Sequence, residues 1–204
     1  MSSGAPPVNY PELSMKTSLT LAVLIAGVVA VPAFAQDAAT QTQRDTQQQQ
    51  RIESGLQSGS LSTHEAGTLE RDEAHVDRLQ ANALRDGTLS NGEKARIQAA
   101  QDRSSAHIAT DKHNARHGNP QSKSSQRMQM DVQRNAAQQA RIHEGVASGA
   151  LSNREASSIE RGQVRVARSE SAAAANGHVG AVEEARVQGR ENVQSARIHR
   201  DKHD

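Results

Sequence analysis

The stretch Ser58-Gly59-Ser60-Leu61-Ser62-Thr63-His64-Glu65 decides how this chain folds, because it recurs and divides much of the sequence into helix-length segments. A glycine just after a helix suits the left-handed C′ position, where a Cβ atom would be strained. Ser62 and Glu65 have the S-x-x-E spacing of a capping box, and Leu61 stands where an apolar residue staples the incoming chain to the next helix. The stretch therefore predicts a joint that ends one helix and begins another.

The pattern of this joint returns three times. Asp86-Gly87-Thr88-Leu89-Ser90-Asn91-Gly92-Glu93 and Ser148-Gly149-Ala150-Leu151-Ser152-Asn153-Arg154-Glu155 keep every key position. Residues 176–183 form a weaker copy, with Gly180 in place of the capping serine. The predicted joint residues are Gly59, Leu61, Ser62 and Glu65; Gly87, Leu89, Ser90 and Glu93; and Gly149, Leu151, Ser152 and Glu155.

A calcium loop is the alternative interpretation of the same spacing. D-G-x-L-S-x-x-E matches the second half of an EF-hand loop, with glycine at position 6 and glutamate at position 12. Calcium also needs side-chain oxygens at positions 1, 3 and 5. Position 3 is apolar in all four copies, where the residues are Leu56, Leu84, Val146 and Ala174. The pattern therefore favours a structural joint over a degenerate calcium site.

Residues 51–114 and 141–204 are two copies of one sequence. Arg51-Ile52 matches Arg141-Ile142 at a separation of 90 residues (141 − 51 = 90), and the register continues without a gap to a shared S-A-x-I-x-x-D-K-H block. So many ungapped identities indicate internal duplication. Apolar residues within the segments fall mostly at steps of three, four and seven, and no useful stretch alternates with period two. The segments are therefore expected to be helices.

The expected fold class is all-α, with two tandem copies of a three-helix antiparallel unit and a polar N-terminal lead-in. We expect a solvated Gln-rich lead-in at 36–50, helical repeat 1 at 51–114, a linker with the start of the next helix at 115–132, and helical repeat 2 at 133–204. The apolar stripes are narrow, so each unit is near the limit for folding alone. Either the two copies pack on each other or two chains pair, and the oligomeric state stays open.

Residues 1–35 have the pattern of a secretory signal peptide. Residues 15–35 form its core, with a basic start at Lys16, an apolar run over 21–31 and an Ala33-Phe34-Ala35 cleavage site. Residues 1–14 fit an upstream start, and the sequence leaves open whether Met1 or Met15 is the initiator. An uncleaved interfacial anchor is the alternative. The pattern predicts a periplasmic or secreted protein with no membrane span after cleavage.

Composition argues against several classes of activity. Past the cleavage site the chain has no Phe, Tyr, Trp or Cys, and its formal charge is +1. Without a basic footprint or aromatic platforms, nucleic-acid binding is not expected, and the arginines interleaved with acids are expected to be solvated. His64-Glu65-Ala66-Gly67-Thr68 begins like a zincin motif but lacks its second histidine, and P-loop and nucleophile-elbow motifs are missing. We therefore expect no enzymatic activity and no cofactor.

Histidine pairs are the remaining chemical candidates. His113 and His117 are four residues apart, as are His199 and His203, and on a continuous helix each pair would share a face suited to a transition metal. Gly118 and Pro120 interrupt the first pair. Lysine and histidine at a helix C-terminus are also favoured by the helix dipole, so a structural role is the simpler interpretation.

The run R-I-x-x-G-x-x-S-G-x-L-S-x-x-E-A, followed by D-G-x-L-S-x-x-E and S-x-x-I-x-x-x-K-H-[ND], resembles a group of small exported proteins of Gram-negative bacteria. They are rich in Gln and Arg and have no assigned activity. The resemblance covers residues 51–114 and 141–204 and implies export and helical duplication. Our leading hypothesis is a non-enzymatic exported protein that acts by surface interaction with an unknown protein or envelope partner, or by self-association. The alternatives are an envelope metal-binding protein and a disordered chain that folds on its partner.

Overall fold

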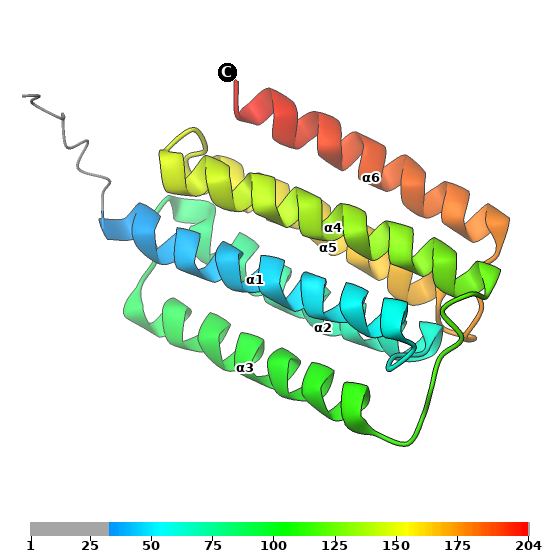
Figure 1. Ribbon diagram of the computed structural model, residues 1–204. Helices are drawn as coiled ribbons and strands as arrows, with labels where there is room; N and C mark the ends of the chain where they lie inside the picture. Colours follow the sequence, from blue (N-terminus) through cyan, green and yellow to red (C-terminus); the bar gives the residue numbers. More distant parts are fainter. Residues whose placement is uncertain (1–32, 204) are drawn as a thin grey trace, which may run out of the picture. The chain divides into compact units, whose positions relative to one another are not determined.

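The computed structural model describes residues 33–203, and this part of the chain is helical, without a strand (Figure 1). The helices are α1 (Ala33–Ser58), α2 (Thr63–Ala83), α3 (Asn91–His113), α4 (Lys123–Ser148), α5 (Asn153–Ala173) and α6 (Ala181–Asp201), with a short 3₁₀ helix, η1 (Leu84–Asp86), after α2. The predicted all-α class is confirmed. The signal segment predicted over 1–35 falls outside the described residues up to residue 32. Within 33–203, no helix combines the length and apolar character that a membrane span requires.

Corresponding helices begin 90 residues apart. α1 and α4 begin at residues 33 and 123, α2 and α5 at 63 and 153, and α3 and α6 at 91 and 181. We call residues 33–113 the first half and residues 123–201 the second half. α1 extends through the whole Gln-rich segment 36–50, where the sequence predicts a solvated linker. Ala38, Gln48 and Gln49 in this segment are buried, because α1 packs against α4, α3 and α2.

The two halves pack against each other along their first two helices. The most extensive contacts join α1 to α4 and α2 to α5. α1 and α4 run side by side in opposite directions, and the α2–α5 pair lies behind them (Figure 1). α3 packs on α1 and α2 at one edge, and α6 packs on α4 and α5 at the other. Of the two arrangements that the sequence leaves open, the structure has the copies packed together.

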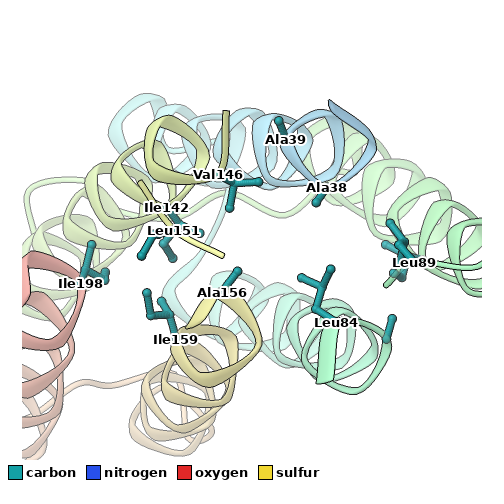
Figure 2. Close-up of a cluster of buried hydrophobic side chains, with 12 residues drawn as sticks. Ala38, Ala39, Leu84, Leu89, Ile142, Val146, Leu151, Ala156, Ile159 and Ile198 are labelled. Atoms are coloured by element: carbon teal, nitrogen blue, oxygen red, sulfur yellow. The ribbon is translucent and has the colours of Figure 1, made fainter. Parts of the chain in front are cut away.

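Two apolar clusters fill the two ends of this bundle. Cluster A, drawn in Figure 2, consists of Ala38, Ala39, Ala83, Leu84, Leu89, Ile97, Ile142, Val146, Leu151, Ala156, Ile159 and Ile198. Cluster B consists of Ile52, Leu56, Leu61, Ala66, Leu69, Ile108, Met128, Val132, Ala173, Ala174, Val179 and Val187. Most members of one cluster lie 90 residues from a member of the other, as Leu61 does from Leu151. Each cluster takes residues from both halves, so neither half has a core of its own.

The linker between the halves is held against the first joint. The Gly118 N–H donates to the Gly59 carbonyl oxygen at 2.9 Å. A Cβ atom at Gly118 would lie 2.2 Å from the Leu61 carbonyl oxygen, so only glycine allows this approach. The Asn114 amide also donates to Glu65 Oε1 at 2.9 Å. The crossing from α3 to α4 is therefore fixed to the start of α2.

Candidate functional site: a buried polar layer

The four joints have the geometry of helix stops and caps. The backbone φ angles of Gly59, Gly87, Gly149 and Gly177 are +76°, +91°, +78° and +81°, in the left-handed region. Ser62 with Glu65, Ser90 with Glu93, and Ser152 with Glu155 each form a complete capping box. At the fourth joint only the backbone half exists, in which the Gly180 N–H donates to Glu183 Oε2 at 2.8 Å. These residues therefore have structural roles.

The leucine of the joint packs over the preceding helix. The Leu61 N–H donates to the Gly55 carbonyl at 2.9 Å, and a Cβ atom at Gly55 would lie 2.5 Å from Leu61 Cδ1. Leu151 and Gly145 repeat both distances in the second half. Leu89 is buried in cluster A. The residues at calcium-loop position 3 are also buried in the apolar clusters: Leu56, Leu84, Val146 and Ala174.

The histidine candidates lie at the surface near the ends of α3 and α6. His113 Nδ1 is 2.7 Å from the Ala109 carbonyl oxygen, whereas His117 lies in the linker beyond α3, so this pair does not share a helix. His203 Nδ1 is 2.6 Å from the His199 carbonyl oxygen, and the two rings lie 4.4 Å apart. In the described residues, no group of three or more His, Asp or Glu is arranged to hold a metal ion.

A buried polar layer lies between clusters A and B. On each helix its residues fall between those that enter the two clusters, as Asp45 does between Ala39 and Ile52 on α1. Its carboxyl groups belong to Asp45, Glu70, Glu73, Asp77, Asp131, Glu160, Glu170 and Glu191, each at most 3% exposed. Its amide side chains are Gln41, Gln48, Gln49, Gln80, Gln101, Asn135, Gln138, Gln139, Gln163 and Gln194. The centre of the bundle is therefore acidic and amide-rich rather than apolar.

Amide groups from neighbouring helices donate to part of these carboxyls. Gln80 Nε2 on α2 and Gln101 Nε2 on α3 each lie 2.6 Å from a different oxygen of Asp45. Asn135 Nδ2 on α4 donates to Glu170 Oε2 at 2.7 Å and lies 3.5 Å from Glu70 Oε2. The first set of bonds joins α1, α2 and α3, and the second joins α4 to α5 and α2.

The layer has more acceptors than donors. Fifteen buried side-chain atoms in the described residues have no hydrogen-bond partner, and every one is an oxygen. They include both carboxyl oxygens of Asp131 and of Glu160. Among the described side chains, no Lys, Arg or His is buried. Arg134 reaches the layer from its rim, with Nη1 3.1 Å from Glu191 Oε2. Ionised carboxylates at these positions would face one another without enough compensating charge.

Burial raises the pKa of all eight carboxyl groups, because an ionised carboxylate loses its hydration there. The pKa of Asp45 rises to about 6, those of Glu70 and Glu191 to about 7, and that of Asp131 to about 8, where Glu191 and Glu184 add to the effect of burial. The pKa values of four others lie well above their usual range: Glu73, Asp77, Glu160 and Glu170. A carboxyl group that keeps its proton can donate a hydrogen bond to an amide or carboxyl oxygen.

One small cavity lies within the layer. The cavity lined by Gln49, Asp77, Asn135, Gln139 and Gln163 measures about 10 Å³. That is close to the minimum that a single water needs. Without movement of the helices, this cavity can therefore take up a proton or at most one water molecule.

Sequence reasoning missed this layer because its residues are of types usually exposed. Asp45, Gln48 and Gln49 continue the stripe that contains Ile52, at steps of three and four, back into the Gln-rich segment. That spacing was the available signal. No protein-family model, no curated protein and no solved structure matches this chain. What can be concluded about its function therefore rests on its own residues.

Proposed function

We propose that this chain is an exported, non-enzymatic helical protein that acts by surface interaction in the periplasm or cell envelope, and that its folded state is loaded with protons and favoured by acid. One observation carries the proposal: eight carboxyl groups are buried among amide side chains, with no buried cation among residues 33–203. Export is supported by the signal pattern at residues 1–35.

The direction of the pH effect follows from the raised pKa values. The folded protein binds these protons more tightly than the unfolded chain, whose carboxyls titrate near 3.8 to 4.5. The stabilisation is complete below that range, decreases as the pH rises above it, and is lost once the pH has passed about 6 to 8, where the folded-state groups titrate. Each proton that the folded state alone retains changes the free energy of unfolding by about 1.4 kcal/mol per pH unit.

Acid groups from five helices face one another in the layer, so they oppose each other's ionisation. They come from α1 (Asp45), α2 (Glu70, Glu73 and Asp77), α4 (Asp131), α5 (Glu160 and Glu170) and α6 (Glu191); α3 adds Gln101 and Ser104. The cations that act on the layer are Arg44 and Arg134, and Arg44 is also paired with Asp102. If all eight carboxyls keep their protons, the formal charge of the chain changes from +1 to +9. The surface is then far more basic than the composition indicates.

Thermal unfolding followed by circular dichroism from pH 4.5 to 8.5 tests the proposal. Uptake of two protons on folding would lower the free energy of unfolding by about 3 kcal/mol per pH unit, or roughly 6–12 °C in melting temperature. A melting temperature that rises between pH 4.5 and 7.5 would contradict the proposal.

Two variants make the test specific. Glu170→Gln introduces the amide that Gln80 provides 90 residues earlier, and it should reduce the pH dependence and stabilise the protein at pH 7.5. Glu144→Gln removes a carboxyl whose side chain is 71% exposed and pairs with Lys202 away from the layer, and it should leave the pH dependence over this range unchanged. Equal effects of the two variants would show that the buried layer is not the source.

A further inference from the structure

A groove between α5 and α6 collects positive charge on the second half. It consists of two adjoining hollows of about 470 and 260 Å³, which share Arg186 and Arg190. Arg168 lines the larger hollow and Arg165 the smaller one. All four arginines are exposed, and none has a hydrogen bond or ion pair within the described residues. We call this feature the α5–α6 groove.

The acidic residues near the groove are engaged elsewhere. Glu183 lines the larger hollow, but its Oε2 accepts from the Gly180 N–H at the start of α6. Glu184 pairs with Arg127 of α4 at 2.6 Å. Glu191 is 1% exposed and belongs to the buried layer. The groove therefore has four guanidinium groups against one carboxylate, and it complements an anion.

Gly189 on α6 lines the smaller hollow without a side chain. A Cβ atom built there meets nothing within 4 Å, so no neighbour among the described residues requires glycine. Glycine in the interior of a helix lowers its stability relative to alanine. Its use at a position flanked by Arg186 and Arg190 is explained if a ligand approaches the backbone there. Gly162 differs, because a Cβ atom at that position would lie 1.8 Å from Gln194 Oε1.

The chemistry around the arginines selects the anion. Guanidinium groups bind phosphate oxygens bidentately. Val182 and Val193 are each 66% exposed, and their spacing from Arg186, Gly189 and Arg190 places them on the same face of α6. Exposed apolar residues beside arginines suit a membrane surface with anionic lipid. Proteins that bind single-stranded nucleic acid use aromatic side chains on which the bases stack, and residues 37–203 contain no Phe, Tyr or Trp. The groove therefore fits a lipid phosphate better than a nucleic-acid strand.

We propose that the α5–α6 groove binds the phosphate groups of anionic lipid headgroups and holds the second half against a membrane surface. This inference rests on the surface-interaction part of the proposed function and is independent of the proton-loaded layer. Loss of lipid binding would leave the pH dependence of unfolding unaffected. A flat pH dependence would leave the lipid result unaffected.

The first half supplies a matched control. Arg78 and Arg96 stand 90 residues before Arg168 and Arg186, but the hollow that Arg96 lines measures only about 170 Å³. The residues lining the groove in the second half include four arginines and one acid. The equivalent positions of the first half, 90 residues earlier, hold three arginines and two acids. Arg78→Gln/Arg96→Gln and Arg168→Gln/Arg186→Gln therefore remove the same total charge from different places.

Sedimentation of the full chain with vesicles of phosphatidylglycerol and phosphatidylcholine, at pH 5.5, tests the proposal. The apolar run over residues 21–31 contributes equally to every variant, so the ratio between variants is the readout. About fivefold weaker binding is expected for each arginine removed from the groove, or roughly 25-fold for Arg168→Gln/Arg186→Gln. The first-half pair should change binding by less than about threefold. Gly189→Glu, which favours helix, should weaken binding without unfolding the protein.

Four results would overturn the proposal. One is an equal loss for both arginine pairs, because binding would then depend on total charge. Another is equal wild-type binding to vesicles of phosphatidylcholine alone. Tighter binding of a single-stranded oligonucleotide, lost in the groove variant, would assign the groove to nucleic acid. Complete displacement of the vesicles by millimolar inorganic phosphate would assign it to free phosphate.

Discussion

The two halves of the molecule build the same three helices but distribute their polar residues differently. In the buried layer, an acid in one half usually corresponds to an amide in the other. The pairs 90 residues apart are Asp45 and Asn135, Gln41 and Asp131, Glu73 and Gln163, Gln80 and Glu170, and Gln101 and Glu191. Only Glu70 and Glu160 are acidic in both halves. The surface between the second and third helix of each half differs in charge. Asp72 pairs with His107 in the first half, and the equivalent positions of the second half hold Gly162 and Arg197.

This difference shows which features the fold requires and which it only tolerates. Apolar residues occupy most equivalent positions in clusters A and B, because both ends of the bundle must exclude water. The layer between them has a hydrogen-bonding side chain at most equivalent positions and accepts either an acid or an amide there, although Ala167 stands where the first half has Asp77. The outer surface of each half is free to differ. Function that depends on surface charge can therefore belong to one half alone.

The largest effect is expected where the two halves are most alike. Leu61→Ala and Leu151→Ala each remove a buried side chain from an equivalent joint, and each should cost about 3 kcal/mol. Because each cluster takes residues from both halves, both variants should unfold in one transition. Denaturant unfolding followed by circular dichroism measures this. Two separate transitions, with one half left folded, would refute the shared core. Val182→Ala, at a side chain that is 66% exposed, is the control.

A smaller effect, dependent on pH, is expected where an acid corresponds to an amide. Neither oxygen of Asp131 has a donor among the described residues, and its pKa is raised to about 8 by burial and nearby acids. Asp131→Asn should therefore leave stability little changed at pH 4.5 and raise it by about 1–3 kcal/mol at pH 8, where the wild type must ionise or hold a proton.

Asp45→Asn is the matched substitution in the first half. Asp45 accepts from Gln80 and Gln101, and burial raises its pKa only to about 6. The gain at pH 8 should be smaller than for Asp131→Asn, because the substitution also places an amide N–H against one of those two donors. Melting temperatures of both variants across the pH range provide the test. An equal or larger gain for Asp45→Asn would show that donors do not control the cost of these buried acids.

The sequence predicts local structure well here because the joint residues act through their immediate neighbours. Gly59, Ser62 and Glu65 need only the backbone within a few residues of them to stop one helix and cap the next. The buried layer depends instead on helices that are distant in sequence, in the same half as well as in the other. Gln48 and Asp45 have no apolar character of their own. Their burial is compensated by hydrogen bonds to Gln101 on α3, which form when α3 and α4 pack against α1.

The charge of the surface could not be read from composition for the same reason. Glu160-Arg161 and Arg190-Glu191 are adjacent oppositely charged pairs, which indicate solvated helix faces with balanced charge. In the structure both glutamates are buried and both arginines are exposed. Neighbours in sequence therefore lie in different environments. The net charge of +1 consequently gives no indication of the basic α5–α6 groove.

The smallest effect is expected at the one joint that lacks a capping hydroxyl. Ser90 and Gly180 are equivalent, and both glutamates three residues later accept the cap N–H, at 2.9 and 2.8 Å. Gly180 has φ −81° and ψ 166°, which serine adopts readily, and a Cβ atom there approaches only the flexible end of Glu183. Gly180→Ser should therefore stabilise the protein by about 0.5 kcal/mol, and Ser90→Gly should destabilise it by a similar amount. Amide hydrogen exchange in the first turns of α3 and α6 measures both changes locally. Slower exchange at the start of α6 in Gly180→Ser, with α3 unchanged, is the expected result. Faster exchange there would mean that the α6 terminus is held by its contacts with α4 and α5 and that the cap contributes nothing.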